Sequence, residues 1–445
     1  MFKSKRRNAG QERKKRRFWP ILSAMLVLCY LAVAAWFTFA GTDKGRNEKD
    51  TEEAPEAIIA ATATPSPTPT PTPTVAPSPT PAVLIEDLEE TAAVAPSPSP
   101  VPLGPAVEVR GLYISAWSAG MADGMARFIE LCETTEINAL VIDVKDDLGK
   151  ITFLTDTEGI STSCVNIIPD IGGIVENLKS RGVYTIARVV CFKDPVWSAE
   201  HPELAIQNSS GLPWKDGGGI SWLDPYNTGA WDYIAEVALE AAMVGFDEVQ
   251  LDYVRFPLDG RLGDINYGEA GEDKSKTEVI SEFVTYIREL LANEGVRLSA
   301  DVFGIVAISS IDAEDTGQDP GLLLSSADSL CPMIYPSHFA NKKQNGKGQR
   351  INGVLFEAPD LQPYEVVYNI LLELRRHLGD GSGQAVIRPY LQDFTASYLG
   401  AGYYQRYNAQ QVRKQIQAVY DAGFDEWILW NHSSVYSDGA FEPSE

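Results

Sequence analysis

The feature that most constrains the fold is a regular alternation of two kinds of segment from about residue 107 to the end of the chain. Short apolar runs rich in β-branched and aromatic residues alternate with longer amphipathic stretches. This alternation is typical of βα units arranged around a parallel sheet. Eight segments have the composition of strands, namely 109–115, 139–144, 184–192, 248–253, 297–303, 329–335, 385–391 and 426–430. The helical pattern is clearest at 171–180, 231–244, 276–293, 364–378 and 410–421.

Glycines support these boundaries, because four of them stand between a predicted helix and the next predicted strand. They are Gly182, Gly245, Gly295 and Gly423. Glycine is the usual residue where a helix ends in a left-handed conformation before the chain turns into a strand. The sequence Gly-Phe-Asp-Glu also occurs twice at such a turn, at 245–248 and 423–426, which hints at a repeated βα unit.

Eight βα-type strands within residues 105–445 predict a (β/α)8 TIM barrel with enlarged loops. A doubly wound open sheet is the alternative. Neither a G-x-G-x-x-G motif after the first strand nor a P-loop is found in the sequence, which counts against that alternative. Only fifteen residues follow the eighth strand, so the closing helix of the barrel is short or missing, which counts against the barrel.

The N-terminal part predicts export. Residues 1–17 form a basic tail with nine Lys or Arg and one Glu, and residues 18–40 are an almost uncharged apolar run of bilayer-spanning length. The positive-inside rule then places the tail in the cytoplasm and the rest of the chain outside, as a single-pass signal-anchor protein of the cell membrane. A cleaved signal peptide is the alternative, since residues 38–40 loosely resemble a cleavage site.

Residues 41–104 are predicted to be a linker. Alternating Pro and Ser or Thr at 64–73, with a second Pro-rich burst at 96–102, favours an extended polyproline II spacer. The net charge is -24 although the tail is basic, so the rest of the chain is strongly acidic. An acidic domain argues against a nucleic-acid partner, because phosphate backbones are bound by clustered Lys and Arg.

The ends of the predicted strands are rich in carboxylates, and a TIM-barrel active site lies at the C-terminal ends of its strands. Asp252 lies in an apolar strand beside Leu251 and Val254. A buried carboxylate is costly unless it is paired or functional, so we expect a catalytic role, with a salt bridge to Arg188 or Arg255 as the structural alternative. Asp301 stands in the same place one strand later, and capping of the following loop is its alternative. Glycoside hydrolysis needs two such carboxyl groups.

Other residues at the strand ends are predicted to bind the substrate. Trp side chains in particular suit a glycan cleft, since flat aromatic faces stack on sugar rings, although packing within the loops would also explain many of the seven Trp after the linker. The expected substrate-binding residues are Trp117, Asp143, Arg188, Arg255, Tyr335, His338, Asp393 and Trp430.

No metal or cofactor is predicted. The four His form neither H-x-x-x-H nor H-E-x-x-H, and the five Cys form no C-x-x-C pair, so a zinc hydrolase is disfavoured. A G-x-S-x-G nucleophile elbow is also missing from the sequence. Buried free thiols are favoured over one or two disulfides for the four Cys that follow the apolar run.

Five segments together resemble a bacterial family assigned to the glycoside hydrolases and first catalogued as a domain of unknown function. They are 110–115, 138–147, 245–257, 299–304 and 332–339, and the resemblance extends over about 108–437. Its most specific part is Asp-Tyr-Val-Arg-Phe-Pro at 252–257. The resemblance implies a TIM barrel distantly related to the alpha-amylase-like glycosidases. It implies the nucleophile at Asp252, and it places Asp301 where the family commonly has a Glu as general acid.

We therefore expect a membrane-anchored, extracytoplasmic glycoside hydrolase that acts on a cell-wall or extracellular polysaccharide. A non-catalytic glycan-binding barrel at the cell surface is the first alternative. A scaffold or wall-assembly protein is the second, and it would expose a large apolar patch instead of a Trp-lined cleft.

Overall fold

The computed structural model describes residues 101–377 and 385–444. The predicted tail, the apolar run and nearly all of the predicted linker lie outside these residues. Within the two described stretches, no helix is both long and apolar enough to cross a bilayer.

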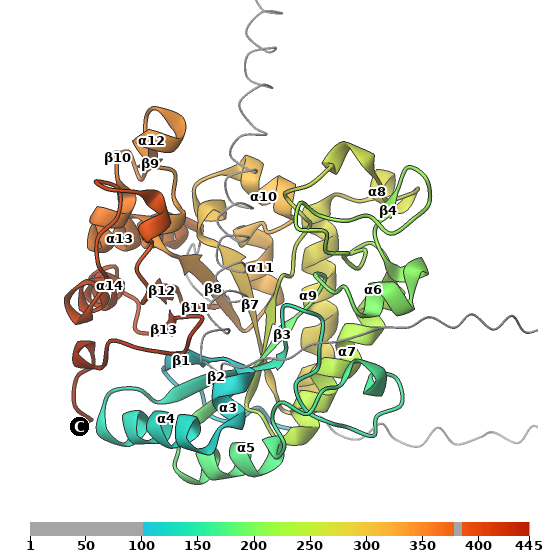
Figure 1. Ribbon diagram of the computed structural model, residues 1–445, viewed down its shortest axis with the longest axis horizontal. Helices are drawn as coiled ribbons and strands as arrows, with labels where there is room; N and C mark the ends of the chain where they lie inside the picture. The colour runs from blue at the N-terminus through green and yellow to red at the C-terminus, as the bar shows by residue number, and fades with distance from the viewer. Residues whose placement is uncertain (1–100, 378–384, 445) are drawn as a thin grey trace, which may run out of the picture. The chain divides into compact units, whose positions relative to one another are not determined.

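Eight strand positions form one closed parallel barrel (Figure 1). Strand β1 pairs with β2 on one side and with β13 on the other, and β7 pairs with β8, so the sheet closes and the doubly wound alternative is wrong. The strands are β1 (Arg110–Ile114), β2 (Ala139–Lys145), β3 (Tyr184–Val190), β5 (Glu248–Asp252), β7 (Arg297–Phe303), β8 (Ser329–Ile334), β11 (Val386–Ile387) with β12 (Tyr390–Gln392), and β13 (Trp427–Trp430). All eight predicted strands are confirmed. The seventh is split into β11 and β12 because Pro389 has no N–H for the ladder.

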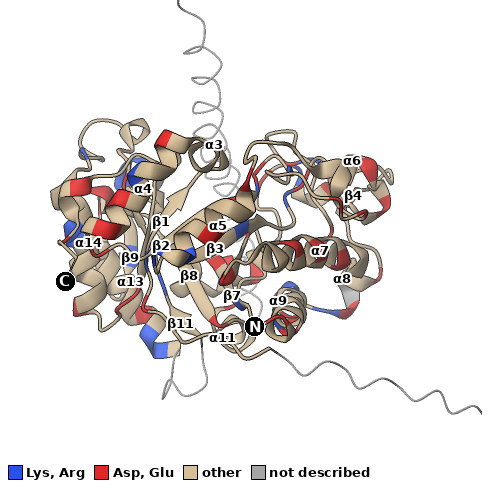
Figure 2. Cartoon of the chain, turned by 90° about the horizontal axis from the view of Figure 1, so that it is seen from below, with Lys and Arg blue, Asp and Glu red and all other residues tan. Residues whose placement is uncertain are grey.

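Helices surround the barrel (Figure 1), and the five predicted ones are confirmed. They are α5 (Ile171–Ser180), α7 (Thr228–Val244), α9 (Lys276–Asn293), α13 (Pro363–His377) and α14 (Ala409–Asp421). Two further helices, α4 (Ala122–Thr134) and α11 (Pro320–Ser326), follow β1 and β7. Between β13 and residue 444 the structure describes one 3-10 turn, at Asp438–Ala440, and no α-helix. Figure 2 shows acidic residues spread over the outer helices, among them α7 and α9.

Short elements decorate the loops that follow the strands. Antiparallel β4 pairs with β6, and β9 pairs with β10 through an Asn352–Gly353 turn in which both residues have positive φ. These strands are β4 (Gln207–Asn208), β6 (Ile265–Asn266), β9 (Gln349–Ile351) and β10 (Val354–Phe356). The short helices are α3 (Ala116–Gly120), α6 (Trp197–Glu200), α8 (Ala270–Asp273), α10 (Ser310–Thr316) and α12 (Lys342–Asn345). Except for α3 and α10, these elements belong to loops of more than twenty residues between a strand and the next long helix.

The barrel interior is filled in layers, because every second residue of a strand points inward. Near the N-terminal ends, Arg388 donates to Glu248 (2.7 Å) and to Glu426 (2.7 Å). In the middle, the Tyr390 hydroxyl donates to Gln250. The same alternation on β5 then brings Asp252 to the top layer, two residues after Gln250 and four after Glu248. The strand pattern itself therefore carries this carboxylate to the mouth of the barrel.

The left-handed conformation predicted for the four glycines between helices and strands can be tested through protein stability. Gly245 has φ 106° and the other three helix-to-strand glycines also have positive φ, as expected. We expect Gly245→Ala to lower the free energy of unfolding by about 1–2 kcal/mol, because an L side chain is strained there. Gly172 in α5 is exposed, has no atom within 4 Å of an added Cβ, and is the matched control. There Ala should stabilise by up to about 1 kcal/mol. Urea unfolding of both variants would show opposite signs, and equal effects would contradict the assignment.

Candidate active site

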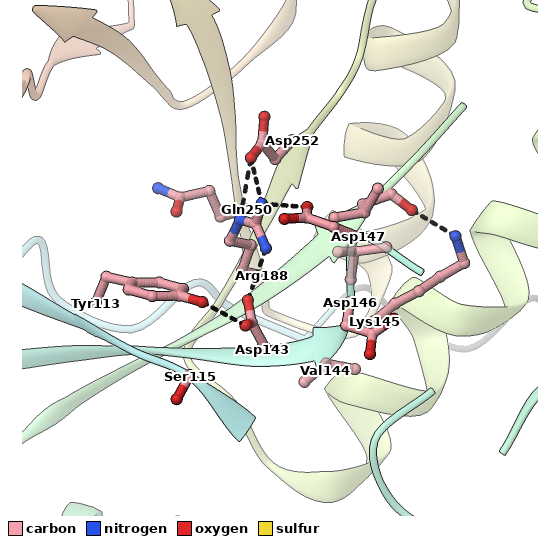
Figure 3. A network of polar contacts seen from close by, with 12 residues as sticks. Tyr113, Ser115, Asp143, Val144, Lys145, Asp146, Asp147, Arg188, Gln250 and Asp252 are labelled. Atoms are coloured by element: carbon pink, nitrogen blue, oxygen red, sulfur yellow. Dashed lines mark hydrogen bonds and ion pairs between the residues drawn. The ribbon is translucent and has the colours of Figure 1, made fainter. Parts of the chain in front are cut away.

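A network of charged side chains centred on Arg188 lies at the C-terminal ends of β2, β3 and β5 (Figure 3). The Arg188 guanidinium donates from Nη1 to Asp143 Oδ1 (2.7 Å). It donates from Nε (3.0 Å) and Nη2 (2.6 Å) to Asp252 Oδ2, and from Nη2 to Asp147 Oδ1 (2.9 Å). One buried cation therefore holds three carboxylates together.

The strand register explains why these residues meet. Asp143 is directly opposite Arg188 on β2 and β3, and Val190 is opposite Asp252 on β3 and β5. The long Arg188 side chain reaches one level up to Asp252, and the Tyr113 hydroxyl on β1 donates to Asp143 Oδ2 (2.6 Å). Asp143, Arg188 and Asp252 were predicted from the sequence to lie at the site, and the structure brings all three together.

The ion pair between Asp252 and Arg188, which the sequence offered as the structural explanation of this carboxylate, is present. This ion pair engages only Oδ2, whereas Oδ1 accepts a hydrogen bond (2.6 Å) from the backbone N–H of Tyr253. Tyr253 has φ 49°, a left-handed conformation that is uncommon for a bulky residue. Strain of this kind clusters at functional sites, where the surrounding packing maintains it. The turn after β5 thus fixes the orientation of the Asp252 carboxylate.

Asp301 on β7 lies beside Asp252. Leu251 is opposite Ala300 in the register of β5 and β7, so the next residues along, the two Asp, are neighbours at the top of the barrel. The Asp301 side chain is buried (the residue is 2% exposed), and Oδ1 has no hydrogen-bond partner. Burial and the adjacent charge of Asp252 hold the pKa of Asp301 well above its ordinary value. This shift favours the protonated form of Asp301, and its side chain does not cap the following loop as the sequence alternative proposed.

Asp143 provides a test of the network through pH. Burial raises the pKa of Asp143 from 3.8 to about 6, against the opposing pull of Arg188. The folded state binds this proton more tightly than the unfolded state. The contribution of Asp143 to the free energy of unfolding therefore falls as pH rises from about 4 to about 6. One proton corresponds to a slope of at most about 1.4 kcal/mol per pH unit. We expect urea unfolding of Asp143→Asn at several pH values to show a flatter decline than the wild type in that window. Identical slopes would contradict the raised pKa.

An aromatic cluster forms the opposite side of the mouth. The Tyr335 ring centroid lies 5.6 Å from that of Trp430 and 5.0 Å from the imidazole of His338, and Phe394 contacts all three rings. His338 is solvent exposed, yet burial lowers its pKa to about 4. With a pKa of about 4, the imidazole of His338 is neutral at neutral pH.

The remaining predicted residues lie in different environments. Trp117 at the rim is 69% exposed, whereas Trp197, Trp214 and Trp222 are packed inside the loop after β3, as the packing alternative proposed. Asp393 is occupied by the C-terminal segment, because Ser437 donates to both of its oxygens (2.7 and 2.8 Å). The structure therefore explains Asp393 without a ligand.

Three residues of the site were missed by sequence reasoning. One is Asp147, which follows β2 and accepts a hydrogen bond from Arg188. Tyr113 points inward on β1 and orients Asp143, and Tyr253 orients Asp252. The alternation along β1 places Tyr113 on the same face as Gly111 and Val109, so the period of the strand could have identified it. The left-handed turn at Tyr253 has no comparable signal. Within the described residues, no cluster of three or more His, Cys, Asp or Glu is arranged to hold a metal ion, and Cys132, Cys164, Cys191 and Cys331 are free thiols.

Comparisons with known proteins agree with this architecture. Residues 111–436 match the model of a family described as "putative glycosyl hydrolase domain". The PgaB (BpsB) glycoside hydrolase domain from Bordetella bronchiseptica is similar over 73% of this chain and 94% of its own, with 13% identity and a TM-score of 0.52. At this identity the similarity concerns the fold alone.

Two further solved structures are similar. A hypothetical protein from Ruminiclostridium thermocellum ATCC 27405 has 38% identity over 43% of this chain and 97% of its own, with a TM-score of 0.40. The glycoside hydrolase domain of PelA from Pseudomonas aeruginosa has 11% identity over 74% of this chain and 96% of its own, with a TM-score of 0.41. No curated protein sequence matches the chain.

Proposed function

The chain belongs to the glycosyl hydrolase domain family that its residues 111–436 match, and we propose that Asp252 and Asp301 are the carboxyl pair with which it cleaves O-glycosidic bonds. The observation that carries the proposal is the contrast between two neighbouring carboxyl groups. Asp252 is ion-paired with Arg188, whereas Asp301 is buried without a hydrogen-bond partner at Oδ1 and has a raised pKa. Pairs of titratable groups whose environments differ in this way supply the acid and the base of such reactions.

The chemistry follows from these two environments. Protonated Asp301 donates its proton to the glycosidic oxygen as the bond to the anomeric carbon breaks. Positive charge develops on the sugar ring and is stabilised by the negative charge of Asp252, which either attacks the anomeric carbon or activates a water molecule. Arg188 and the Tyr253 N–H keep Asp252 in place. Trp430, Tyr335 and His338 line the opposite side, where a sugar ring would stack.

The role of Asp301 leads to a prediction about leaving groups. We expect Asp301→Asn to reduce kcat on a natural glycoside by about 10²–10⁴-fold, because general-acid assistance is lost. An aryl glycoside with a strongly acidic phenol needs no such assistance, so its cleavage should fall much less. Because the Asp301 pKa is raised, wild-type activity should decline as pH rises through it, and this decline should disappear in the variant. Equal losses on both substrates would exclude Asp301 as the acid.

For the location we propose a protein anchored in the cell membrane, with the barrel outside the cell. The basic tail and apolar run of residues 1–40 and the Pro-rich residues 41–104 support this proposal. The first described residues contact the face of the barrel at which the strands begin. Val101 N donates to Asn293 O (3.2 Å) at the end of α9, and Arg297 Nη2 at the start of β7 donates to Gly104 O (2.8 Å). The chain therefore enters on the face opposite Asp252, and an anchor would leave the mouth open to a cell-wall or extracellular polysaccharide.

A non-catalytic glycan-binding barrel remains the second candidate, and one observation favours it. Asp252 and Asp301 are only 8% and 2% exposed, whereas the rim residue Trp117 is 69% exposed. Incubation of the full-length protein with a panel of wall and capsular polysaccharides distinguishes the two. Release of new reducing ends supports the hydrolase, and retention on a polysaccharide affinity gel without release supports the binding barrel.

A further inference from the structure

Arg255 lies three residues after Asp252 and is surrounded by aromatic rings. Its guanidinium carbon is 4.6 Å from the ring centroid of Phe303, 5.0 Å from Trp222 and 5.1 Å from Tyr253. Such contacts attract the cation to the ring faces and fix the orientation of its plane. Among the described residues, Arg255 donates one hydrogen bond, from Nη1 to the backbone oxygen of Phe256 (3.0 Å).

This environment differs from that of the two other arginines inside the barrel. Arg188 has three carboxylate partners and Arg388 has two, whereas Arg255 forms no ion pair with any described residue. Its side chain is only half-buried. The guanidinium therefore has N–H groups on its edge that no group within residues 101–377 and 385–444 accepts.

The carboxylates that act on Arg255 already have other partners. Asp252 is paired with Arg188, and two more lie in the surrounding loops. Asp216 accepts hydrogen bonds from the N–H groups of Gly218 and Ile220 (2.9 Å each) and from Trp222 Nε1 (3.0 Å). Asp259 accepts one from Gly217 N (3.3 Å). A second cation is close, because Lys193 Nζ lies 4.8 Å from the Tyr253 ring centroid. Besides Arg188, the Asp252 side of the mouth thus holds two further cations, of which Arg255 has unused donors.

Arginine in this state favours one class of ligand. Its planar fork matches a carboxylate, which accepts two parallel hydrogen bonds, and hydrogen bonds between ionised groups are about twice as strong as neutral ones. Burial lowers the pKa of Arg255, but the group stays charged at neutral pH, and an anionic partner would compensate for the lost hydration. The acidic charge of the chain opposes an anion at long range, but salt screens it beyond about 8–10 Å.

We propose that Arg255 binds the carboxylate of an acidic sugar beside the scissile bond, so that the substrate is a uronate-bearing polysaccharide. This inference rests on the proposed hydrolase function and narrows its substrate class.

The first test needs no catalysis. Binding of D-glucuronate and D-galacturonate to the full-length protein is measured by saturation-transfer NMR beside D-glucose and D-galactose. We expect the wild type to bind at least one uronate about tenfold or more tightly than the matching neutral sugar, and Arg255→Gln to lose this preference. Arg255→Lys should show an intermediate preference, because it keeps the charge and loses the fork. Arg261→Gln changes an exposed arginine of the same loop and should behave as the wild type.

The second test uses matched polymers. Uronate-bearing polysaccharides are compared with the same polymers after chemical reduction of their carboxyl groups to alcohols. We expect the wild type to cleave the acidic form with at least tenfold higher kcat/KM, and Arg255→Gln to abolish the difference. Cleavage of reduced polymers at an equal rate, with no uronate preference in binding, would overturn the inference and leave the hydrolase intact. Arg255-dependent uronate binding without cleavage of any polymer would instead overturn the hydrolase and leave the Arg255 site intact.

Discussion

Asp252→Asn should reduce kcat by about 10⁴-fold or more while glycan binding changes little. Removing a nucleophile or an essential base from a catalytic unit has effects of this size. The amide has the same shape as the carboxylate and still accepts a hydrogen bond from Arg188, so the sugar site is preserved. It carries no negative charge, however, and neither stabilises the positive charge on the sugar nor attacks the anomeric carbon. The measurement is kcat on the best substrate, with affinity taken from gel retention.

A matched control separates chemistry from folding. Asp232→Asn changes an exposed carboxylate on α7 that accepts a hydrogen bond from Tyr286, and it should keep the kcat of the wild type. The melting temperature of Asp252→Asn should show that the barrel is intact. If a well-folded Asp252→Asn protein retains more than a tenth of the wild-type kcat, Asp252 does not carry the chemistry.

Arg188→Met should produce the largest loss of stability. The substitution keeps much of the aliphatic stem but leaves Asp143 and Asp252 buried without their cation. Breaking a buried ion pair from one side typically costs about 3–5 kcal/mol, because the remaining charge is neither solvated nor paired. Urea unfolding at neutral pH measures this cost. The cost should shrink at lower pH, where Asp143 takes up a proton (pKa about 6).

The control for this effect is an exposed pair. Arg127 contacts Asp438 (3.0 Å), and the two side chains are 40% and 51% exposed. Arg127→Met should cost no more than about 1 kcal/mol, because water already screens such a pair. Comparable losses for Arg127→Met and Arg188→Met would contradict a special role for the Arg188 network in holding the top of the barrel together.

The strands were predictable because each is a short apolar run that ends at a polar residue, and the period of two then shows which side chains point inward. Besides the short helices of the loops, two helices that follow barrel strands, α4 and α11, were missed for local reasons. In α11 the sequence Pro-Gly-Leu-Leu-Leu-Ser-Ser contains poor helix formers, although its N-cap Asp319 and Pro320 at the first position are a recognisable start signal. The α4 helix directly follows the short α3, without a side-chain cap between them, so no clear boundary separates them in the sequence.

The site was predictable to the same extent as the strands. Asp143, Arg188, Asp252 and Asp301 all lie at inward positions near the strand ends, so period and register bring them together. Asp393 has the same signal, but its partner Ser437 comes from a distant loop that no local pattern identifies. The aromatic surroundings of Arg255 likewise come from three separate segments. Contacts between residues far apart in the sequence therefore determine which predicted side chains are hydrogen-bonded within the protein, as Asp393 is, and which keep unused donors, as Arg255 does.

Whether the barrel hydrolyses a glycan through Asp252 is measured most directly by reducing-end release from a panel of wall and capsular polysaccharides. Wild type and Asp252→Asn are measured side by side. We predict release by the wild type and none above background by the variant. Release by both proteins would leave a hydrolase but remove Asp252 from its chemistry. Release by neither, together with measurable retention of a glycan, would contradict the enzymatic account and favour a glycan-binding barrel.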